Sequence, residues 1–328
     1  MAPMAVIALG GNALSPAGGS GRYDEQLAQA TKMAASIAEL ADDGWQIVVV
    51  HGNGPQVGAL AFEQSFQHER VARFVAPQPL FSLGAMTQGQ IGSLLVLALH
   101  QQLGESVPVV SVVSHVVVDA DDPSFSSPTK PIGPFFTGAD ADRLRRERSW
   151  TMVEDSGRGY RRVVPSPTPR TVLEASSIQR LVHGGALVIA CGGGGVPVVA
   201  RDRGYIGVEA VIDKDLVASR LALTLGADTV ALVTGVTNVQ LDFGTAEQRP
   251  LCELDVDTAD RYLQAGQFPA GSMGPKMEAS IAFVRDGGRM AVITTAERLV
   301  STMSPHRSPA DAPIGTRIVS SMSPSRRS

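Results

Sequence analysis

The chain has 328 residues, of which 44% are hydrophobic and 18% charged, and a formal net charge of −4. This composition is typical of a globular protein and argues against general nucleic-acid binding, and no apolar run reaches the ~20 residues that a membrane span needs. The two cysteines, Cys191 and Cys252, lie far apart and lack metal-ligand spacing. We therefore expect a cytoplasmic protein that binds neither nucleic acid nor membranes.

The first part of the chain alternates between strand and helix patterns. An apolar run at residues 5–9 precedes residues 24–41, whose apolar side chains recur at helical spacing, and a second apolar run follows at 47–50. This order predicts a βαβ unit, in which a right-handed crossover joins two parallel strands. Further along, we expect a buried helix at 86–103 and one or two strands at 107–118.

The character of the sequence changes at about residues 120–170, which are rich in Pro, Asp, Arg and Ser. The prolines and glycines argue against long helices, so we expect short hairpins or irregular structure there. Because a compact domain rarely carries a structureless loop of this length, we interpret the segment as an inserted small subdomain that serves as a candidate lid.

From residue 175 the alternation of helices and strands resumes. We expect, in chain order, a helix at 175–182, a strand at 187–190, a helix at 216–225, a strand at 229–233, a helix near 256–264, a helix from 275 and a strand at 290–294. The pattern predicts an α/β protein with a mostly parallel sheet. Residues 320–328 are small, polar and basic, which predicts a disordered tail.

Four glycine-rich turns are the most distinctive local feature. "LGGNA", "HGNGPQ" and "CGGGGVP" follow predicted strands, as "GSMGPK" does less regularly. One such turn is weak evidence, because many are ordinary tight connections. Four such turns at strand ends would meet at the sheet edge where ligands bind, and their backbone N–H groups could bind an anion there. None fits G-x-x-x-x-G-K-[ST] or G-x-G-x-x-G, so neither a Walker-type nor a nicotinamide-binding protein is supported.

Lysine is rare in this sequence, and three of the lysines lie next to a proline or between two aspartates. Lys130 lies in "SPTKPIGP", Lys214 lies between Asp213 and Asp215 in "VIDKDL", and Lys276 lies in "SMGPKM". A lysine ammonium group is a compact charge that can follow phosphate oxygens as they move. Taken alone, the "DKD" tripeptide is equally well explained as a helix N-cap with a solvated lysine, and Lys130 as a surface residue.

Motifs of several enzyme classes are absent from the sequence, which has no G-x-S-x-G, H-E-x-x-H or C-x-x-C. His51 adjoins a glycine turn, but a single histidine at a strand end is more often packed than catalytic. Asp119, Asp121 and Asp122 lack regular ligand spacing and suit a turn better than a metal site. Backbone donors and lysines without a base fit phosphoryl transfer to an acceptor that is already anionic, such as a carboxylate or a carbamate.

With these residues in order, the sequence resembles the carbamate kinases of the amino acid kinase family. The resemblance covers most of the chain through "ALGGNAL", "VVVHGNGPQVG", "DDPSFSSPTKPIGPF", "ACGGGGVPVV", "GVEAVIDKDLVASRLA" and "GSMGPKMEASIAF". It implies an αβα sandwich on a mostly parallel sheet of about eight strands, a single domain over 1–328 with a protruding subdomain, and a homodimer. It also implies reversible phosphoryl transfer between ATP and carbamate, giving carbamoyl phosphate and ADP, with Mg²⁺ carried by the nucleotide and no metal ligand in the protein.

The resemblance further implies roles for individual residues. The catalytic residues would be Lys130, Lys214, Asp215 and Lys276. The acceptor and the transferred phosphoryl group would bind at Gly10, Gly11, Asn12, Gly52, Asn53 and Gly54. The nucleotide would contact Asp213, Lys214, Val236, Met273, Gly274 and Lys276. Relatives that act on amino-acid carboxylates carry a lysine in the first turn, where this chain has Asn12, and the subdomain lysine that replaces it favours a small acceptor.

Four positions depart from the family pattern. Gly235 and Thr237 replace acidic residues near the expected adenine site, and Phe81 and Ser93 replace Asp and Tyr. Two alternatives therefore stay open: a catalytically impaired nucleotide or metabolite sensor of the same fold, and a kinase for another small carboxylate or phosphate acceptor. Fold similarity alone does not decide the acceptor.

Overall fold

The computed structural model describes residues 2–10, 22–71, 76–155, 157–269, 271–303 and 315–321. Two predicted site residues, Gly11 and Asn12, lie outside these ranges, as does the predicted tail beyond residue 321.

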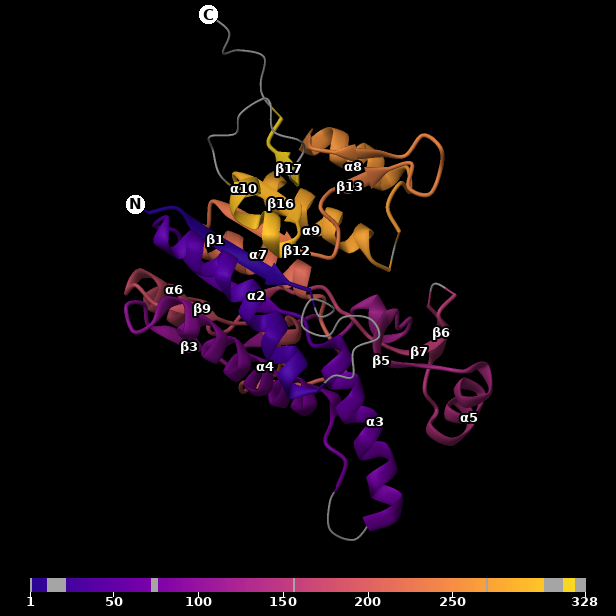
Figure 1. Ribbon diagram of the computed structural model, residues 1–328. Coiled ribbons are helices and arrows are strands. Elements are labelled where there is room, and N and C mark those ends of the chain that lie inside the picture. The colour runs from indigo at the N-terminus through magenta and orange to yellow at the C-terminus, as the bar shows by residue number, and fades with distance from the viewer. Residues whose placement is uncertain are drawn as a thin grey trace, which may run out of the picture.

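An eight-stranded sheet forms the centre of the molecule (Figure 1). Its strands lie in the order β15-β17-β16-β12-β1-β2-β9-β3, and every neighbouring pair is parallel except β16 and β17. The strands are β1 (Met4–Leu9), β2 (Gln46–His51), β3 (Val109–Ser111), β9 (Leu187–Ile189), β12 (Thr229–Val233), β15 (Glu253–Asp255), β16 (Met290–Thr294) and β17 (Thr316–Val319). Because β1 and β2 pair in parallel, the predicted βαβ unit is confirmed.

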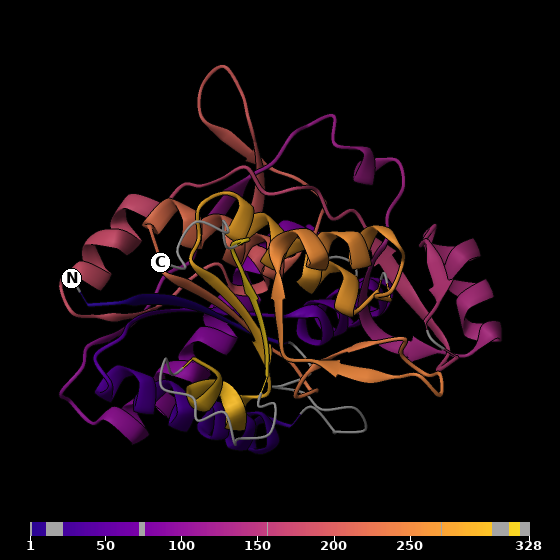
Figure 2. The same cartoon turned by 90° about the horizontal axis from the view of Figure 1, so that it is seen from above.

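Helices cover both faces of this sheet (Figure 2). One face carries α2 (Tyr23–Asp42), α4 (Leu80–Leu103) and α10 (Leu299–Met303), and the other carries α6 (Ala175–His183), α7 (Lys214–Leu225), α8 (Val256–Gln264) and α9 (Met273–Arg285). Successive residues of β1 alternate between the two cores, with Val6 and Ala8 in one and Ala5 and Ile7 in the other. This arrangement confirms the predicted αβα sandwich.

Helix α4 accounts for the most apolar stretch of the chain. Among the described residues, it is the one helix long and apolar enough to cross a membrane, with a mean hydropathy of 1.3 over its best window, of which 44% is buried. Its residues Leu83, Ile91, Leu95 and Leu99 are buried inside the molecule. Packing in the core therefore explains the apolar character, and the same composition is common in core helices.

A smaller sheet protrudes from the main body beside helix α3 (Figure 1). It consists of β5 (Lys130–Phe136), β7 (Tyr160–Val164) and β6 (Met152–Glu154), all antiparallel, and is accompanied by α5 (Gly138–Arg148). The hairpins are as expected, but α5 was not predicted. Thr137 caps this helix by accepting a hydrogen bond from the Asp140 N–H, and the prolines of the segment all lie outside it. The wider bounds of about 120–170 stay a prediction.

The remaining elements connect these parts. A four-stranded sheet contains β4 (His115–Val117), β8 (Thr171–Val172), β10 (Val196–Ala200) and β11 (Tyr205–Gly207), and a hairpin joins β13 (Val239–Leu241) to β14 (Arg249–Leu251). Helix α3 (Gly54–Val71) begins inside the "HGNGPQ" turn, where the sequence predicted only a glycine-rich loop. Proline is tolerated in the first turn of a helix, since its missing N–H would have no intrahelical partner there.

Helix α3 crosses β5 at a point where both backbones carry glycine. A Cβ atom on Gly58 would lie 2.0 Å from the backbone nitrogen of Gly133, and Gly133 itself has a φ of +74°. Any side chain at position 58 must therefore push β5 away. Lys130 begins the same strand, so this crossing sets the position of the lysine that the subdomain supplies.

We expect Gly58→Ala to destabilise the protein by roughly 1–3 kcal/mol or more and to lower kcat by displacing Lys130. Thermal unfolding and initial rates would measure the two effects. Ala59→Ser is the matched control, because it adds one heavy atom to the next position of α3, which is exposed. Wild-type kcat and stability in Gly58→Ala would show that the crossing does not control the strand.

Candidate active site

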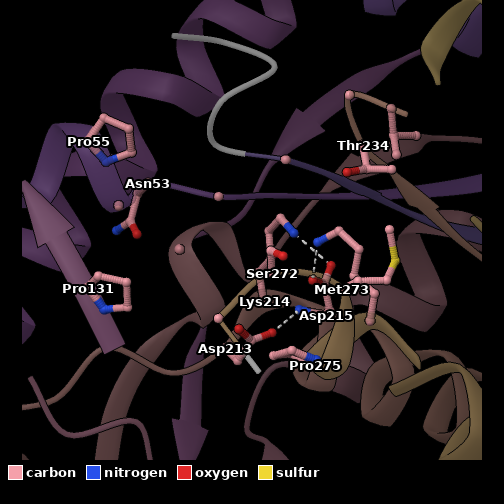
Figure 3. Close-up of a pocket in the computed structure, with 18 of the residues that line it drawn as sticks. Asn53, Pro55, Pro131, Asp213, Lys214, Asp215, Thr234, Ser272, Met273 and Pro275 are labelled. Carbon is pink, nitrogen blue, oxygen red and sulfur yellow. Dashed lines mark hydrogen bonds and ion pairs between the residues drawn. The ribbon is translucent and has the colours of Figure 1, made fainter. Parts of the chain in front are cut away.

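A cavity of about 780 Å³ opens at the carboxyl ends of five adjacent strands of the central sheet (Figure 3). Each strand contributes a lining residue shortly after it ends, and these are Gly10, Gly52, Gly193, Thr234 and Thr295 after β1, β2, β9, β12 and β16. Three of the glycine-rich turns therefore meet at one sheet edge, as predicted. The fourth, "GSMGPK", also lines the cavity, but it precedes α9 instead of following a strand.

Three helices begin at this cavity. Helix α3 starts at Gly54, α7 at Lys214 and α9 at Met273, and all three residues line the cavity. The free N–H groups and the dipole of a helix N-terminus favour an anion. Asp213 caps α7 by accepting a hydrogen bond of 2.8 Å from the Asp215 N–H. The cavity is thus built to receive negative charge.

Two aspartates hold three lysines at the centre of the cavity. Lys214 Nζ donates to Asp215 Oδ1 at 2.6 Å, and Lys276 Nζ donates to Asp215 Oδ2 at 2.8 Å. Lys130 Nζ donates to the Asp213 carboxylate, which links the protruding sheet to the start of α7. The three lysines singled out in the sequence therefore converge on one cluster, whose three ammonium groups and two carboxylates leave one positive charge.

Burial and neighbouring charges act on these groups in opposite directions. Burial alone would raise the pKa of Asp215, but the ammonium groups of Lys214 and Lys276 outweigh it and hold that pKa well below its usual range. Burial would likewise raise the pKa of Asp213, but the ammonium groups of Lys130 and Lys214 together outweigh it and lower that pKa. Both carboxylates are therefore ionised at neutral pH.

The two lysines on Asp215 differ from each other. Burial lowers the pKa of Lys214, and the attraction of Asp215 only partly opposes this effect. Burial also acts to lower the pKa of Lys276, but Asp215 outweighs it and the net shift is upward. Lys214 is therefore the lysine whose charged form an arriving anion would stabilise most, because a nearby negative charge favours the protonated form.

The other predicted residues fall into three groups. Gly10, Gly52, Asn53, Gly54, Val236 and Met273 line the cavity. Gly274 is buried in α9 and is not among the lining residues, because its position faces the Pro269 carbonyl, which a Cβ there would approach to 3.1 Å. Gly11 and Asn12 belong to the part of the chain outside the described ranges.

The tetraglycine turn serves packing more than ligand contact. Gly193, Gly194 and Gly195 have φ values of +64°, +87° and +79°, which disfavour any other residue. A Cβ on Gly192 would lie 2.2 Å from His51 Nε2, and a Cβ on Gly193 would lie 2.1 Å from Asn53 Nδ2. Of the four glycines only Gly193 lines the cavity. The turn thus supports the side chains of His51 and Asn53, on either side of Gly52.

His51 has the packed role that the sequence favoured. Its ring is buried against the tetraglycine turn, and its Nδ1–H donates to the Gly52 carbonyl at 3.1 Å. Burial lowers the pKa of His51 to about 4, so the ring is neutral at neutral pH. This hydrogen bond helps to orient the Gly52 peptide, and the ring itself does not line the cavity.

A fourth lysine at the cavity was missed by the sequence analysis. The chain has 24 arginines and only four lysines, and all four lysines line this one cavity. The fourth, Lys32, lies on α2 beside Gln29 and Met33, which also line the cavity. It is exposed and, within the described part of the chain, has no carboxylate partner. A count of lysines would have drawn attention to it.

Comparisons with known proteins agree with this geometry. The model of the amino acid kinase family matches residues 3–295. The chain is 44% identical over 301 residues to a carbamate kinase of Pyrococcus horikoshii, and this alignment covers 91% of this chain and 95% of that protein. It is also 44% identical over 302 residues to carbamate kinase 2 of Enterococcus faecalis, covering 90% of this chain and 94% of that one.

A solved structure of a relative has the same architecture. The carbamate kinase of Giardia lamblia bound to AMP-PNP superposes with a TM-score of 0.85 at 36% identity, covering 98% of this chain and 99% of that chain. Both the family match and these relatives span nearly all of the described structure, including the strand ends and helix starts that form the cavity. The chain therefore belongs to the amino acid kinase family, within the group that contains these carbamate kinases.

Proposed function

We propose that this protein catalyses reversible phosphoryl transfer between ATP and carbamate, forming carbamoyl phosphate and ADP. The observation that carries the proposal is the meeting of Lys130, Lys214 and Lys276, each from a different element, in one cavity between three helix N-termini. Carbamate is already anionic and has no proton to lose when it attacks phosphorus. Catalysis then needs only alignment and neutralisation of charge, which such a site provides.

Each part of the cavity suits one part of the reactants. The acceptor and the transferred group would lie against Gly10 and the loop of Gly52, Asn53 and Gly54, whose N–H groups and helix terminus attract oxygen anions. The nucleotide phosphates would lie near Lys214, Lys276 and the start of α9, with Val236 and Met273 beside the base. Mg²⁺ would enter as part of the nucleotide substrate, because Asp213 and Asp215 are both engaged by lysines.

During transfer, negative charge moves from the bridging oxygen of one partner to that of the other. Lys214 and Lys276 are held on the same carboxylate, so they keep their spacing while the phosphoryl group passes. Lys130 approaches from the protruding sheet and would neutralise the acceptor side. Asp215 would act as a positioning residue, since its two oxygens each orient one lysine.

The direct test is the ATP-forming reaction. Mixing the protein with carbamoyl phosphate and MgADP should produce ATP, which luciferase luminescence would measure, at rates far above those of an identically purified Lys276→Met variant. Absence of ATP above that control would contradict the proposal. Tight ADP binding without ATP would then identify a nucleotide sensor, and a panel of acceptors with labelled ATP would identify a kinase for another small acceptor.

Lys32 would act at the mouth of the cavity by attracting anionic substrates. We expect Lys32→Glu to lower kcat/KM for carbamoyl phosphate and MgADP by about three- to tenfold at low ionic strength, with the loss shrinking as salt is added. Arg220→Glu makes the same change of charge at an exposed position of α7 outside the cavity and is the control. Equal effects of the two variants would mean that Lys32 has no special place in substrate capture.

We also propose that the protein works as a homodimer. Large apolar side chains on neighbouring elements are 46–51% exposed, namely Met86 and Leu97 of α4, Val113, and Tyr205 and Ile206 of β11. Such a surface is typical of a protein interface.

Phe81, by contrast, does not lie on this surface. It packs against Gly207 and so belongs to the internal contact between α4 and β11. Sedimentation equilibrium should give twice the chain mass of 34.4 kDa. The cytoplasmic location stays a prediction.

A further inference from the structure

We infer that Thr87 determines the acceptor specificity of this enzyme by fixing the orientation of the Asn53 amide, an inference that rests on the proposed function. Thr87 lies on α4 and is completely buried, with no atom of its own in the lining of the cavity. It acts through Asn53, so it is a positioning residue. Neither its position in the sequence nor its side-chain chemistry singles it out.

The Thr87 hydroxyl has a single proton to donate. Thr87 Oγ1 donates that proton to the Gly84 carbonyl one turn earlier in α4, at 2.8 Å. The same oxygen lies 2.8 Å from Asn53 Nδ2. Because the hydroxyl proton is already engaged, its oxygen can only accept from Asn53, and it accepts from the amide nitrogen.

This arrangement decides which end of the Asn53 amide faces the substrate. If the amide turned over, its oxygen would face the Thr87 oxygen, and the hydroxyl could donate to it only by giving up its hydrogen bond to the Gly84 carbonyl. Gly193 packs directly against the amide, and only a glycine fits there, since a Cβ at this position would lie 2.6 Å from Asn53 Oδ1. The nitrogen is therefore held toward α4 and the oxygen is left for the cavity.

The Asn53 oxygen lies open to the cavity, because it is not among the fully buried side-chain atoms that lack a hydrogen-bond partner. Asn53 is only 3% exposed, and within the described residues its Oδ1 accepts no hydrogen bond. In Figure 3 the amide lies on the cavity wall with its oxygen on the side nearer Lys214 and its nitrogen on the far side. A ligand that covers this oxygen without donating to it leaves a buried acceptor unpaired, which costs about 1–3 kcal/mol, so a substrate that donates to it is favoured by about that amount.

Carbamate and carbamoyl phosphate carry such a donor in their –NH₂ group. Acetate and acetyl phosphate have the same shape, but a methyl group replaces the amino group and leaves the Asn53 oxygen unpaired. A site built to accept a hydrogen bond rejects an analogue that lacks the donor more strongly than a size filter does. The hydrogen-bond chain from Gly84 through Thr87 to Asn53 is thus a device for recognising the amino group of the acceptor.

Thr87→Val tests this inference, because valine has the same shape without the hydroxyl. We expect the ratio of kcat/KM for carbamoyl phosphate to that for acetyl phosphate to fall by roughly 10- to 100-fold, equivalent to about 1.4–2.7 kcal/mol, with KM for MgADP unchanged. Thr87→Ser keeps the hydroxyl and should keep the wild-type ratio. Acetyl phosphate is assayed as substrate and as competitive inhibitor, so a preference is obtained even if its turnover is slow.

The outcomes separate the possible roles of Thr87. A ratio of activities does not depend on the fraction of folded enzyme, so simple destabilisation would lower both rates and leave the ratio unchanged, which would overturn the inference. Should Thr87→Val fail to fold, Asn53→Leu removes the acceptor oxygen directly and must collapse the same ratio. A wild-type protein that makes no ATP from carbamoyl phosphate would refute the proposed function instead.

Discussion

Lys214→Met and Lys276→Met are each expected to lower kcat by about a thousandfold or more, equivalent to roughly 4 kcal/mol of transition-state stabilisation. Each substitution removes an ammonium group aligned with the transferring phosphoryl group, while methionine keeps a similar volume in the buried cluster. The remaining lysine cannot compensate, because Asp215 holds each one on a separate oxygen at 2.6 and 2.8 Å. Initial rates of ATP formation at saturating substrates would measure the loss.

The same two helices offer matched controls. Arg220 lies on α7 with Lys214, and Arg285 lies on α9 with Lys276, where it pairs with Asp260 on the exposed side of the molecule at 2.8 Å. Exposed ion pairs contribute little, so Arg220→Met and Arg285→Met should keep near wild-type rates. Near wild-type turnover in both lysine variants would overturn the roles that we propose for them.

Asp215→Asn is expected to have the second largest effect, on stability as well as on rate. Removing this carboxylate leaves two buried ammonium groups that repel each other, and breaking a buried pair in this way typically costs about 3–5 kcal/mol. Without Asp215, burial and the neighbouring lysine both act to lower the pKa of Lys214 further. We therefore expect loss of charge at Lys214, and with it a fall in kcat of at least about tenfold.

The acid dependence of stability gives an independent check. The folded pKa of Asp215 lies below its unfolded value of about 3.9, so its stabilisation is complete above that pH and is lost as the pH falls through the folded pKa. Asp215→Asn should remove the part of the stability loss at acidic pH that comes from protonation of Asp215. Urea unfolding at neutral and acidic pH would measure this change. Asp257→Asn, an exposed carboxylate 4.0 Å from Arg285, is the control and should be nearly neutral. Equal stability of Asp215→Asn and wild type would show that the carboxylate does not hold the lysines together.

The Lys130–Asp213 pair connects this cluster to the protruding sheet. Lys130 is 83 residues from Asp213 in the sequence, and β5 is anchored near it by Ile132, which is buried in a small core with Val57, Val164 and Val211. An incoming phosphate would compete with Asp213 for Lys130. The position of the subdomain and the charge of the site are therefore linked in the structure.

Local patterns in the sequence determined most of the central sheet and its helices. The apolar runs of β1, β2, β12 and β16 and the helical spacing of α2 appear in the structure close to their predicted limits, because buried parallel strands need continuous apolar residues and an amphipathic helix needs its periodicity. The lysines were recognisable because lysine is rare here and three of the four stand beside glycine, proline or aspartate. Helices α3 and α5 were missed, because each lies next to glycines and prolines that predict a turn.

Only the tertiary structure decided how these residues act together. Asp215 binds Lys276 although 61 residues separate them in the sequence, and Thr87 orients Asn53 over a separation of 34 residues. Such contacts depend on the packing of whole elements, so they leave no local pattern in the sequence. Lys32 reads as an ordinary surface lysine until α2 is placed beside the cavity. The tetraglycine turn read as an anion loop until the packing of His51 and Asn53 against it was visible. Chemical type is a local property of the sequence, whereas distance, orientation and burial arise only when the chain is folded.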